Sequence, residues 1–106
     1  MSLFAQTPKP PYYAVIFTSA LANQNTDDYE KMSQIMSDLA MQQDGFLGLE
    51  SARNQVGITI SYWKDLASIQ KWKANLAHAQ AQKLGKEKWY KHYQVRIAKV
   101  ERDYHK

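Results

Sequence analysis

Residues 46–63 read FLGLESARNQVGITISYW, and this stretch decides the fold. Ile58–Trp63 consists largely of β-branched and aromatic residues and alternates between faces, so Tyr62 and Trp63 point to opposite sides of a strand. Phe46–Arg53 precedes it, and the intervening NQVG is a hairpin-length loop that contains Gly. The stretch therefore predicts two antiparallel strands joined by a short turn.

Helical patterns flank this hairpin on both sides. Apolar residues recur at helical spacing from Asp27 to Gln43, and Gly45 is placed to end that helix. A second helix is predicted from Asp65, a good N-cap residue, to about Lys83. Its apolar stripe is predicted to be Leu66, Ile69, Trp72, Leu76 and Ala79.

Two further strands are predicted outside the helices. Tyr12–Leu21 is a nearly continuous apolar run, typical of a strand buried on both faces, and Tyr90–Arg102 alternates between apolar and polar residues. The order βαββαβ predicts an α+β ferredoxin-like fold, a four-stranded antiparallel sheet with both helices on one face. The other face would keep large apolar side chains, which monomers rarely expose. We therefore expect a homodimer through the open sheet face.

Length and composition favour a single small domain. We expect an extended arm at 1–11, a domain at 12–102 and a polar tail at 103–106. The 106 residues are 44% hydrophobic, which excludes a disordered chain, and they contain no Cys, which excludes disulfides and Cys-based zinc sites. No apolar run is long enough to span a membrane, and we identify no signal peptide, so we expect a cytoplasmic protein without membrane contact.

Positive charge is concentrated toward the C-terminus. Residues 83–106 carry eight basic and three acidic side chains, a net +5, whereas the whole chain carries +4. Such a segment is typical either of a face that attracts anions or of a solvated strand and helix end. Because +4 is small for a dedicated nucleic-acid binder, no nucleic-acid partner is expected.

The usual catalytic motifs are missing from the sequence. Its four glycines form no phosphate-binding loop, and it has no G-x-S-x-G elbow and no Cys nucleophile. The three histidines are not spaced as a helical metal pair, so no metal site is expected. His78 lies ~120° around the second helix from Trp72, at the flank of the apolar stripe. A histidine there can be a general base or a haem ligand, or simply a partly exposed side chain.

Aromatic residues are abundant around the second helix. For most of these residues an aromatic core is the favoured interpretation, and the alternative is an apolar pocket for a flat phenolic ligand, with Tyr62, Trp63 and Trp72 around it. Spacing does not select among the polar residues that would orient such a ligand. These are Arg53, Ser61, Asn75, His78 and Arg96.

Residues 45–53, 57–63 and 64–72, followed by His78, resemble the antibiotic biosynthesis monooxygenase (ABM) superfamily. The resemblance covers about 12–102 and implies a dimeric α+β barrel. It also implies one of two activities, cofactor-independent oxygenation of a phenol- or quinol-type substrate with O₂, or haem binding and degradation. Trp72 matches the tryptophan of the family's haem site, whereas Gln82 and Phe17 stand where that site has His and Asn.

The resemblance favours a cofactor-free monooxygenase of a small aromatic substrate. In this hypothesis His78 deprotonates or orients the substrate, and Arg53 or Arg96 stabilises developing oxyanion charge. Trp63, Trp72 and Tyr62 form the walls of the pocket, and Asn75 is a further substrate contact. The alternatives are a haem-binding or haem-degrading protein and a ligand-binding dimer without turnover.

Overall fold

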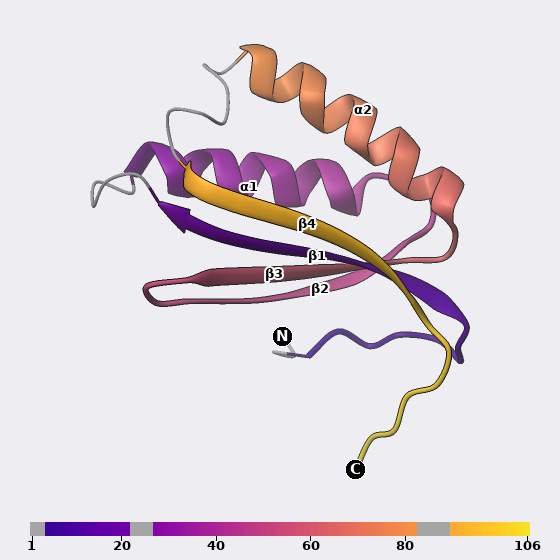
Figure 1. The fold of residues 1–106 in the computed structure, drawn as a ribbon. Helices are drawn as coiled ribbons and strands as arrows, with labels where there is room; N and C mark the ends of the chain where they lie inside the picture. The colour runs from indigo at the N-terminus through magenta and orange to yellow at the C-terminus, as the bar shows by residue number, and fades with distance from the viewer. Residues whose placement is uncertain (1–3, 22–26, 83–89) are drawn as a thin grey trace.

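The chain forms one antiparallel sheet with two helices. The computed structural model describes residues 4–21, 27–82 and 90–106, except for the side chains of 21, 27–33, 76–82, 90 and 91. The elements, in chain order, are β1 (Tyr12–Leu21), α1 (Asp27–Met41), β2 (Phe46–Arg53), β3 (Gly57–Trp63), α2 (Leu66–Gln82) and β4 (Tyr90–Val100). The sheet order is β2-β3-β1-β4 (Figure 1), which confirms the predicted α+β ferredoxin-like fold. No helix in the described ranges has the length and apolarity needed to cross a membrane.

Both helices contribute to a core on one side of the sheet, which we call the helix face. α1 runs behind the sheet in Figure 1, and α2 packs beside α1. The buried core cluster joins Val15 of β1, Ala40 of α1, Trp63 of β3 and Ile69 of α2. Trp63 is completely buried. Its position at the end of β3, directly before α2, therefore ties the sheet to both helices.

Strand register assigns each side chain to the helix face or to the opposite, open face. Val15 lies opposite Ile97, so both belong to the helix face with the core. Ile16 lies opposite Ile60 on one side and Arg96 on the other, so these three share the open face. The predicted alternation of β3 and β4 is confirmed.

The N-terminal arm packs against the open face. The backbone N–H of Ala5 donates a hydrogen bond to the Glu50 carboxylate at 3.0 Å. Gly48 permits this approach, because a Cβ at that position would lie 2.9 Å from the Ala5 Cβ. The Thr7 hydroxyl donates to the Tyr12 hydroxyl at 3.0 Å. The arm thus covers part of β2 and the start of β1.

The C-terminal tail is tied to the same strand end. The Tyr12 hydroxyl donates to the Asp103 carboxylate at 2.6 Å. Burial, and then the hydrogen bond to Asp103, raise the pKa of Tyr12. Tyr12 therefore links the arm, β1 and the tail.

β3 and α2 match the predicted bounds to within one residue, whereas α1 and β4 each end two residues early. α1 ends at Met41 rather than Gln43, because the Gln43 N–H donates to the Ala40 carbonyl and so tightens the last turn. β4 ends at Val100 rather than Arg102. Val100 pairs with Tyr12, and the residue before Tyr12 is Pro11, which has no N–H to continue the ladder.

Candidate functional site

An aromatic cluster lies on the helix face where β3 meets α2. The Trp63 and Trp72 ring centroids are 5.1 Å apart with a 31° tilt, and Phe46 packs edge-on against Trp63 at 5.4 Å. The Trp63 indole Nε1–H donates to the buried Ser61 hydroxyl at 2.9 Å. Trp63 is therefore both packed and fully hydrogen-bonded.

Trp72 differs from Trp63 in the hydrogen bonding of its indole nitrogen. Its indole Nε1 is buried, and no described residue accepts a hydrogen bond from it. A buried donor without an acceptor costs about 1–3 kcal/mol. Such a group within an aromatic cluster is a donor available to an oxygen of a bound ligand.

A second group lies on the helix face at the far end of β1. The Arg53 guanidinium donates a hydrogen bond to the buried Ser19 hydroxyl. Next to Ser19 along the face, the Phe17 and Tyr93 rings pack with centroids 5.6 Å apart. This end of the face therefore offers a fixed positive charge beside aromatic surface, which suits stabilisation of a negatively charged oxygen.

Apolar side chains of β4 extend the helix face beyond β1. Val95 and Ile97 of β4 lie opposite Phe17 and Val15, so they share the helix face. Their side chains are nevertheless 48% and 51% exposed, because the helices cover this part of the sheet incompletely. The helix face thus has uncovered apolar surface along β4, with β1 between it and Trp63 of β3.

The structure places three of the predicted site residues on one face, but only Trp63 and Trp72 are in contact. Trp63, Trp72 and Arg53 all belong to the helix face. His78 lies on α2, six residues beyond Trp72, and its side chain is outside the described part of the structure. Asn75 is exposed on α2 and donates through Nδ2 to the Gln43 side-chain oxygen at 3.2 Å. Asn75 therefore helps to join α2 to the end of α1.

Two of the predicted residues lie on the opposite side of the sheet. Arg96 is exposed on the open face. Tyr62 also lies there, where its hydroxyl donates to Glu50 at 2.7 Å and its ring packs edge-on against Tyr12 at 5.8 Å. Burial, and then the hydrogen bond to Glu50, raise the pKa of Tyr62 strongly. Within one subunit, Tyr62 supports the arm rather than the tryptophan cluster.

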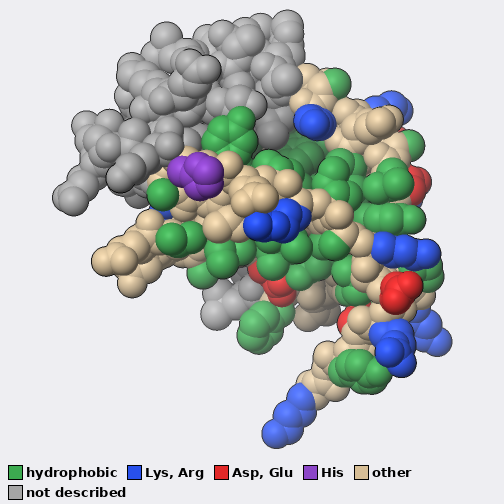
Figure 2. All heavy atoms as spheres, viewed as in Figure 1, with side chains coloured by type: hydrophobic (Ala, Val, Ile, Leu, Met, Phe, Trp, Pro, Cys, Tyr) green, Lys and Arg blue, Asp and Glu red, His purple; other side chains and the backbone are tan. Residues whose placement is uncertain are grey.

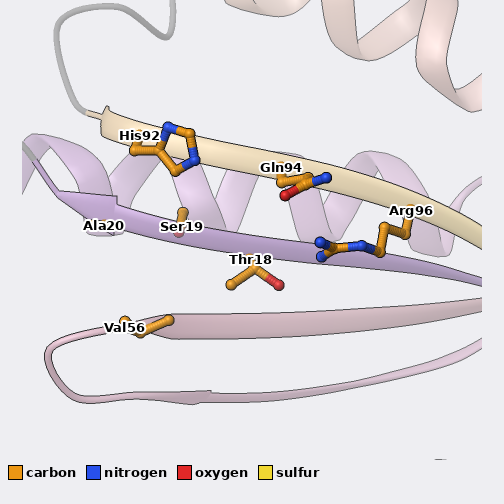
Figure 3. A pocket seen from close by; sticks show the side chains of 7 residues that line it. All are labelled: Thr18, Ser19, Ala20, Val56, His92, Gln94 and Arg96. Carbon is orange, nitrogen blue, oxygen red and sulfur yellow. The ribbon is translucent and has the colours of Figure 1, made fainter.

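The open face also contains a hollow of about 210 Å³ that we did not predict. Figure 3 shows its lining, with polar side chains from β4 directed to the same side as a threonine of β1. The signal in the sequence is the period of two in the last strand, which places every second polar residue on one face. The lining residues are Thr18, Ser19, Ala20, Val56, His92, Gln94 and Arg96.

Metal-binding side chains do not cluster in the described ranges. No group of three or more His, Cys, Asp or Glu residues there is arranged to hold a metal ion.

Comparison with known proteins identifies a relative in sequence and similar solved structures. No protein-family model matches the chain. YqjZ of Bacillus subtilis, described as uncharacterized, is 43% identical over 104 residues, covering 96% of this chain and 90% of YqjZ.

Two solved structures show the same fold at low sequence identity. SnoaB of Streptomyces nogalater, a cofactor-independent oxygenase, superposes with a TM-score of 0.72 at 11% identity, covering 89% of this chain and 97% of SnoaB. A Bordetella bronchiseptica protein provisionally named an antibiotic biosynthesis monooxygenase superposes at 0.66 with 16% identity, covering 84% and 96%. The chain therefore has an ABM-like fold.

Proposed function

Because the chain belongs to the family of Bacillus subtilis YqjZ and has an ABM-like fold, we propose that it is a cofactor-independent monooxygenase of the ABM superfamily. Its substrate would be a small phenol- or quinol-type aromatic, and its co-substrate O₂. The observation that carries the proposal is the buried Nε1–H of Trp72 within the aromatic cluster of the helix face, for which the described residues provide no acceptor. A flat ligand packed against these rings would accept that hydrogen bond through its oxygen.

The proposed reaction needs no electron source other than the substrate. The deprotonated phenol passes one electron to O₂, and the resulting radical pair combines to form a hydroperoxide at a ring carbon. Loss of water leaves a carbonyl at that carbon. Overall, a ring C–H and a phenol O–H react with O₂ to give a quinone and one water.

The residues have separate roles in this proposal. His78, which lies on the same helix as Trp72, takes the phenol proton. Trp72, packed against the buried Trp63, holds the ring, and its Nε1–H orients the substrate oxygen. Arg53, held by the Ser19 hydroxyl, lies opposite Gly57 at the other end of the face and so does not contact a small ring bound at Trp72.

Oxygen uptake by the purified chain with a panel of phenols and quinols tests this proposal. We expect consumption of one O₂ per substrate, with one atom of ¹⁸O₂ in the quinone product, and at least a tenfold loss of rate in His78→Ala. His105→Ala, in the exposed tail, is the matched control and should retain the wild-type rate.

Two outcomes would contradict the proposal. If no member of the panel is consumed, a ligand-binding role without turnover is favoured. If haemin gives a saturable Soret shift at one haem per subunit, followed by bleaching with ascorbate, the chain degrades haem instead.

We also propose that the active form is a homodimer through the open face. Hydrophobic side chains cover much of the face seen in Figure 2, while Lys and Arg gather toward the C-terminal tail. Ile58, on the open face of β3, is 44% exposed. A second copy packed against this face would remove such side chains from water, which stabilises association by roughly 25 cal/mol per Å² of apolar surface before the cost of association is subtracted.

A further inference from the structure

The Trp72 indole N–H is closed to solvent, although the proposed function requires a ligand oxygen to reach it. The Trp72 ring is partly exposed, whereas its Nε1 atom is buried. The ring packs against the core cluster, which includes Ala40 of α1 and Ile69 of α2. A ligand oxygen can therefore come within hydrogen-bonding distance of this N–H only after part of the packing has opened.

α2 is anchored more firmly at its beginning than further along. The Lys64 N–H, directly before the helix cap, donates to the Gly45 carbonyl at 2.8 Å. A Cβ on Gly45 would collide with Ser68, so the loop after α1 is in close contact with the first turn of α2. Ser68 and Ile69 are buried, whereas residues 73–75 are exposed. Figure 1 shows the same difference, because α2 starts beside the end of α1 and the two helices diverge toward the end of α2.

A side-chain hydrogen bond joins the exposed part of α2 to the end of α1. The Asn75 Nδ2–H donates to the Gln43 side-chain oxygen at 3.2 Å. The Gln43 amide is oriented for this contact, because its own Nε2–H donates to the Leu39 carbonyl at 3.2 Å and leaves the oxygen for Asn75. Gln43 is three residues beyond Ala40. Asn75 is likewise three residues, or about one helical turn, beyond Trp72. The bond therefore lies close to the packed Trp72 on both helices.

We propose that the hydrogen bond between Asn75 and Gln43 is a latch, which opens to admit a ligand oxygen to the Trp72 indole N–H. With the latch closed, α2 is held against the end of α1. With the latch open, α2 rotates about its anchored first turn. Both amides can then bond to water, because the latch lies at the surface, so its opening is inexpensive. The identity of the ligand rests on the proposed function, whereas the opening is a property of the free protein.

Exchange of indole protons with solvent tests the latch without any ligand. ¹H–¹⁵N spectra of the full chain give the exchange rate of each indole N–H, and the Trp72 signal is identified by its absence from Trp72→Phe. In the wild type we expect Trp72 to exchange more slowly than free tryptophan, because its N–H is buried. Trp63 is the internal reference, since it is completely buried and bonded to Ser61 and should be exposed only by larger unfolding.

Gln43→Met and Asn75→Leu each remove the latch and keep a side chain of similar size. We expect each variant to raise the Trp72 exchange rate at least about threefold, as for the loss of one hydrogen bond, without changing the rate of Trp63. The double variant should exchange no faster than the single variants, because both remove the same bond. A further rise in the double variant would contradict a shared bond.

The matched control is Gln34→Met. It removes an exposed amide hydrogen bond within α1, from Gln34 to Asp38 at 3.0 Å, and should leave the Trp72 exchange rate within about 1.5-fold of wild type. Ligand association gives a second readout. Under anaerobic conditions, hydroquinone should associate faster with Gln43→Met than with the wild type, by the same factor as the exchange rate rises, because the open state is more populated.

Three further results would overturn the proposal. In the first, the wild-type Trp72 N–H exchanges as fast as free tryptophan. In the second, Gln43→Met and Asn75→Leu change its rate no more than Gln34→Met does. In the third, the Trp63 rate rises in parallel, which would show a loss of global stability instead of a local opening. A wild type that binds no hydroquinone would contradict the proposed function, whereas the exchange rates decide the latch independently.

Discussion

At the scale of single residues, the two stacked tryptophans have different structural roles. Trp63 is completely buried, and its indole N–H is bonded to Ser61. The Trp72 indole N–H is buried without a partner in the described residues. Trp63 therefore stabilises the core. Trp72, in contrast, has a buried N–H that donates to no described residue.

Substitution by phenylalanine should separate these roles. Trp63→Phe loses a hydrogen bond and leaves a cavity, so we expect it to cost about 2–4 kcal/mol of unfolding free energy. Trp72→Phe removes an unsatisfied donor from a partly exposed ring, and we expect a loss at least about 1 kcal/mol smaller. Urea unfolding of both variants measures the difference. Equal losses would show that the Trp72 indole is also a structural group.

Ionisation of Tyr62 should lower the free energy of unfolding at alkaline pH. Burial and the bond to Glu50 raise its folded-state pKa above the unfolded value of 10.0, so its contribution is complete below pH 10 and is lost as the pH rises above that. We expect the free energy of unfolding to fall above pH 10, by up to about 1.4 kcal/mol per pH unit for this one proton. Tyr62→Phe should lower stability at pH 7 and reduce that slope. An unchanged slope in denaturant unfolding between pH 9.5 and 11 would contradict this assignment.

At the scale of elements, α2 depends on its N-terminal cap. Asp65 Oδ1 accepts a hydrogen bond from the Ser68 N–H at 2.8 Å, as the sequence predicted. The side-chain and backbone hydrogen bonds of Ser68 lower the pKa of Asp65. Leu66, predicted to belong to the apolar stripe, is 51% exposed because it is the first residue of the helix and lies outside the core.

Loss of the Asp65 cap should lower both the stability of the protein and its affinity for a phenol. Because the pKa of Asp65 is lowered from 3.8, its contribution is present above pH 3.8 and is lost as the pH falls through the folded-state value. We expect Asp65→Ala to lower the melting temperature at pH 7 and to weaken phenol binding at Trp72, two helical turns further on. Asp65→Asn should retain the cap with less dependence on acidic pH. A wild-type melting temperature for Asp65→Ala would contradict the role of the cap.

Element boundaries were predictable where a sharp chemical signal marks them. β1 begins at Tyr12, directly after Pro11, and β2 begins at Phe46, directly after Gly45, both as predicted. Gly45 has a φ of +89°, and a Cβ there would collide with Ser68. The end of β4 depends instead on its partner strand, because Pro11 cannot continue the ladder beyond Tyr12. Such an end is fixed by tertiary pairing, which the pattern of β4 alone does not contain.

The site was less predictable than the fold. Alternation already separated Tyr62 from Trp63, and the structure places them on opposite faces. The path of the arm to Glu50 follows no periodic signal, because an extended proline-rich segment has no face of its own. Whether the Trp72 N–H finds an acceptor depends on three-dimensional packing, so it was visible only in the structure.

At the scale of the whole molecule, the sheet separates two surfaces of different chemistry. The helix face carries tryptophans and a serine-bound guanidinium, and the open face carries the arm, exposed apolar side chains and the polar hollow. This division allows one face to bind a ligand while the other packs against a second copy.

Charge placed on the open face should disrupt the proposed dimer. Ile58→Glu puts an unpaired carboxylate into the interface, so we expect dimerisation to weaken at least tenfold. Val95→Glu, at a similarly exposed position of the helix face, is the control and should leave the dimer intact. Sedimentation velocity at micromolar concentrations measures both. A wild-type chain that sediments as a monomer, or equal effects of the two variants, would contradict the dimer.

In the proposed function, the Trp72 indole N–H donates a hydrogen bond to an oxygen of an aromatic ligand on the helix face. The most direct measurement is a ¹H–¹⁵N titration of the indole signals with hydroquinone under anaerobic conditions, with the Trp72 signal assigned by its absence from Trp72→Phe. We predict a saturable downfield shift of the Trp72 indole proton, while the Trp63 signal, already bonded to Ser61, stays in place. A Trp72 signal that does not move at saturating hydroquinone would contradict the account.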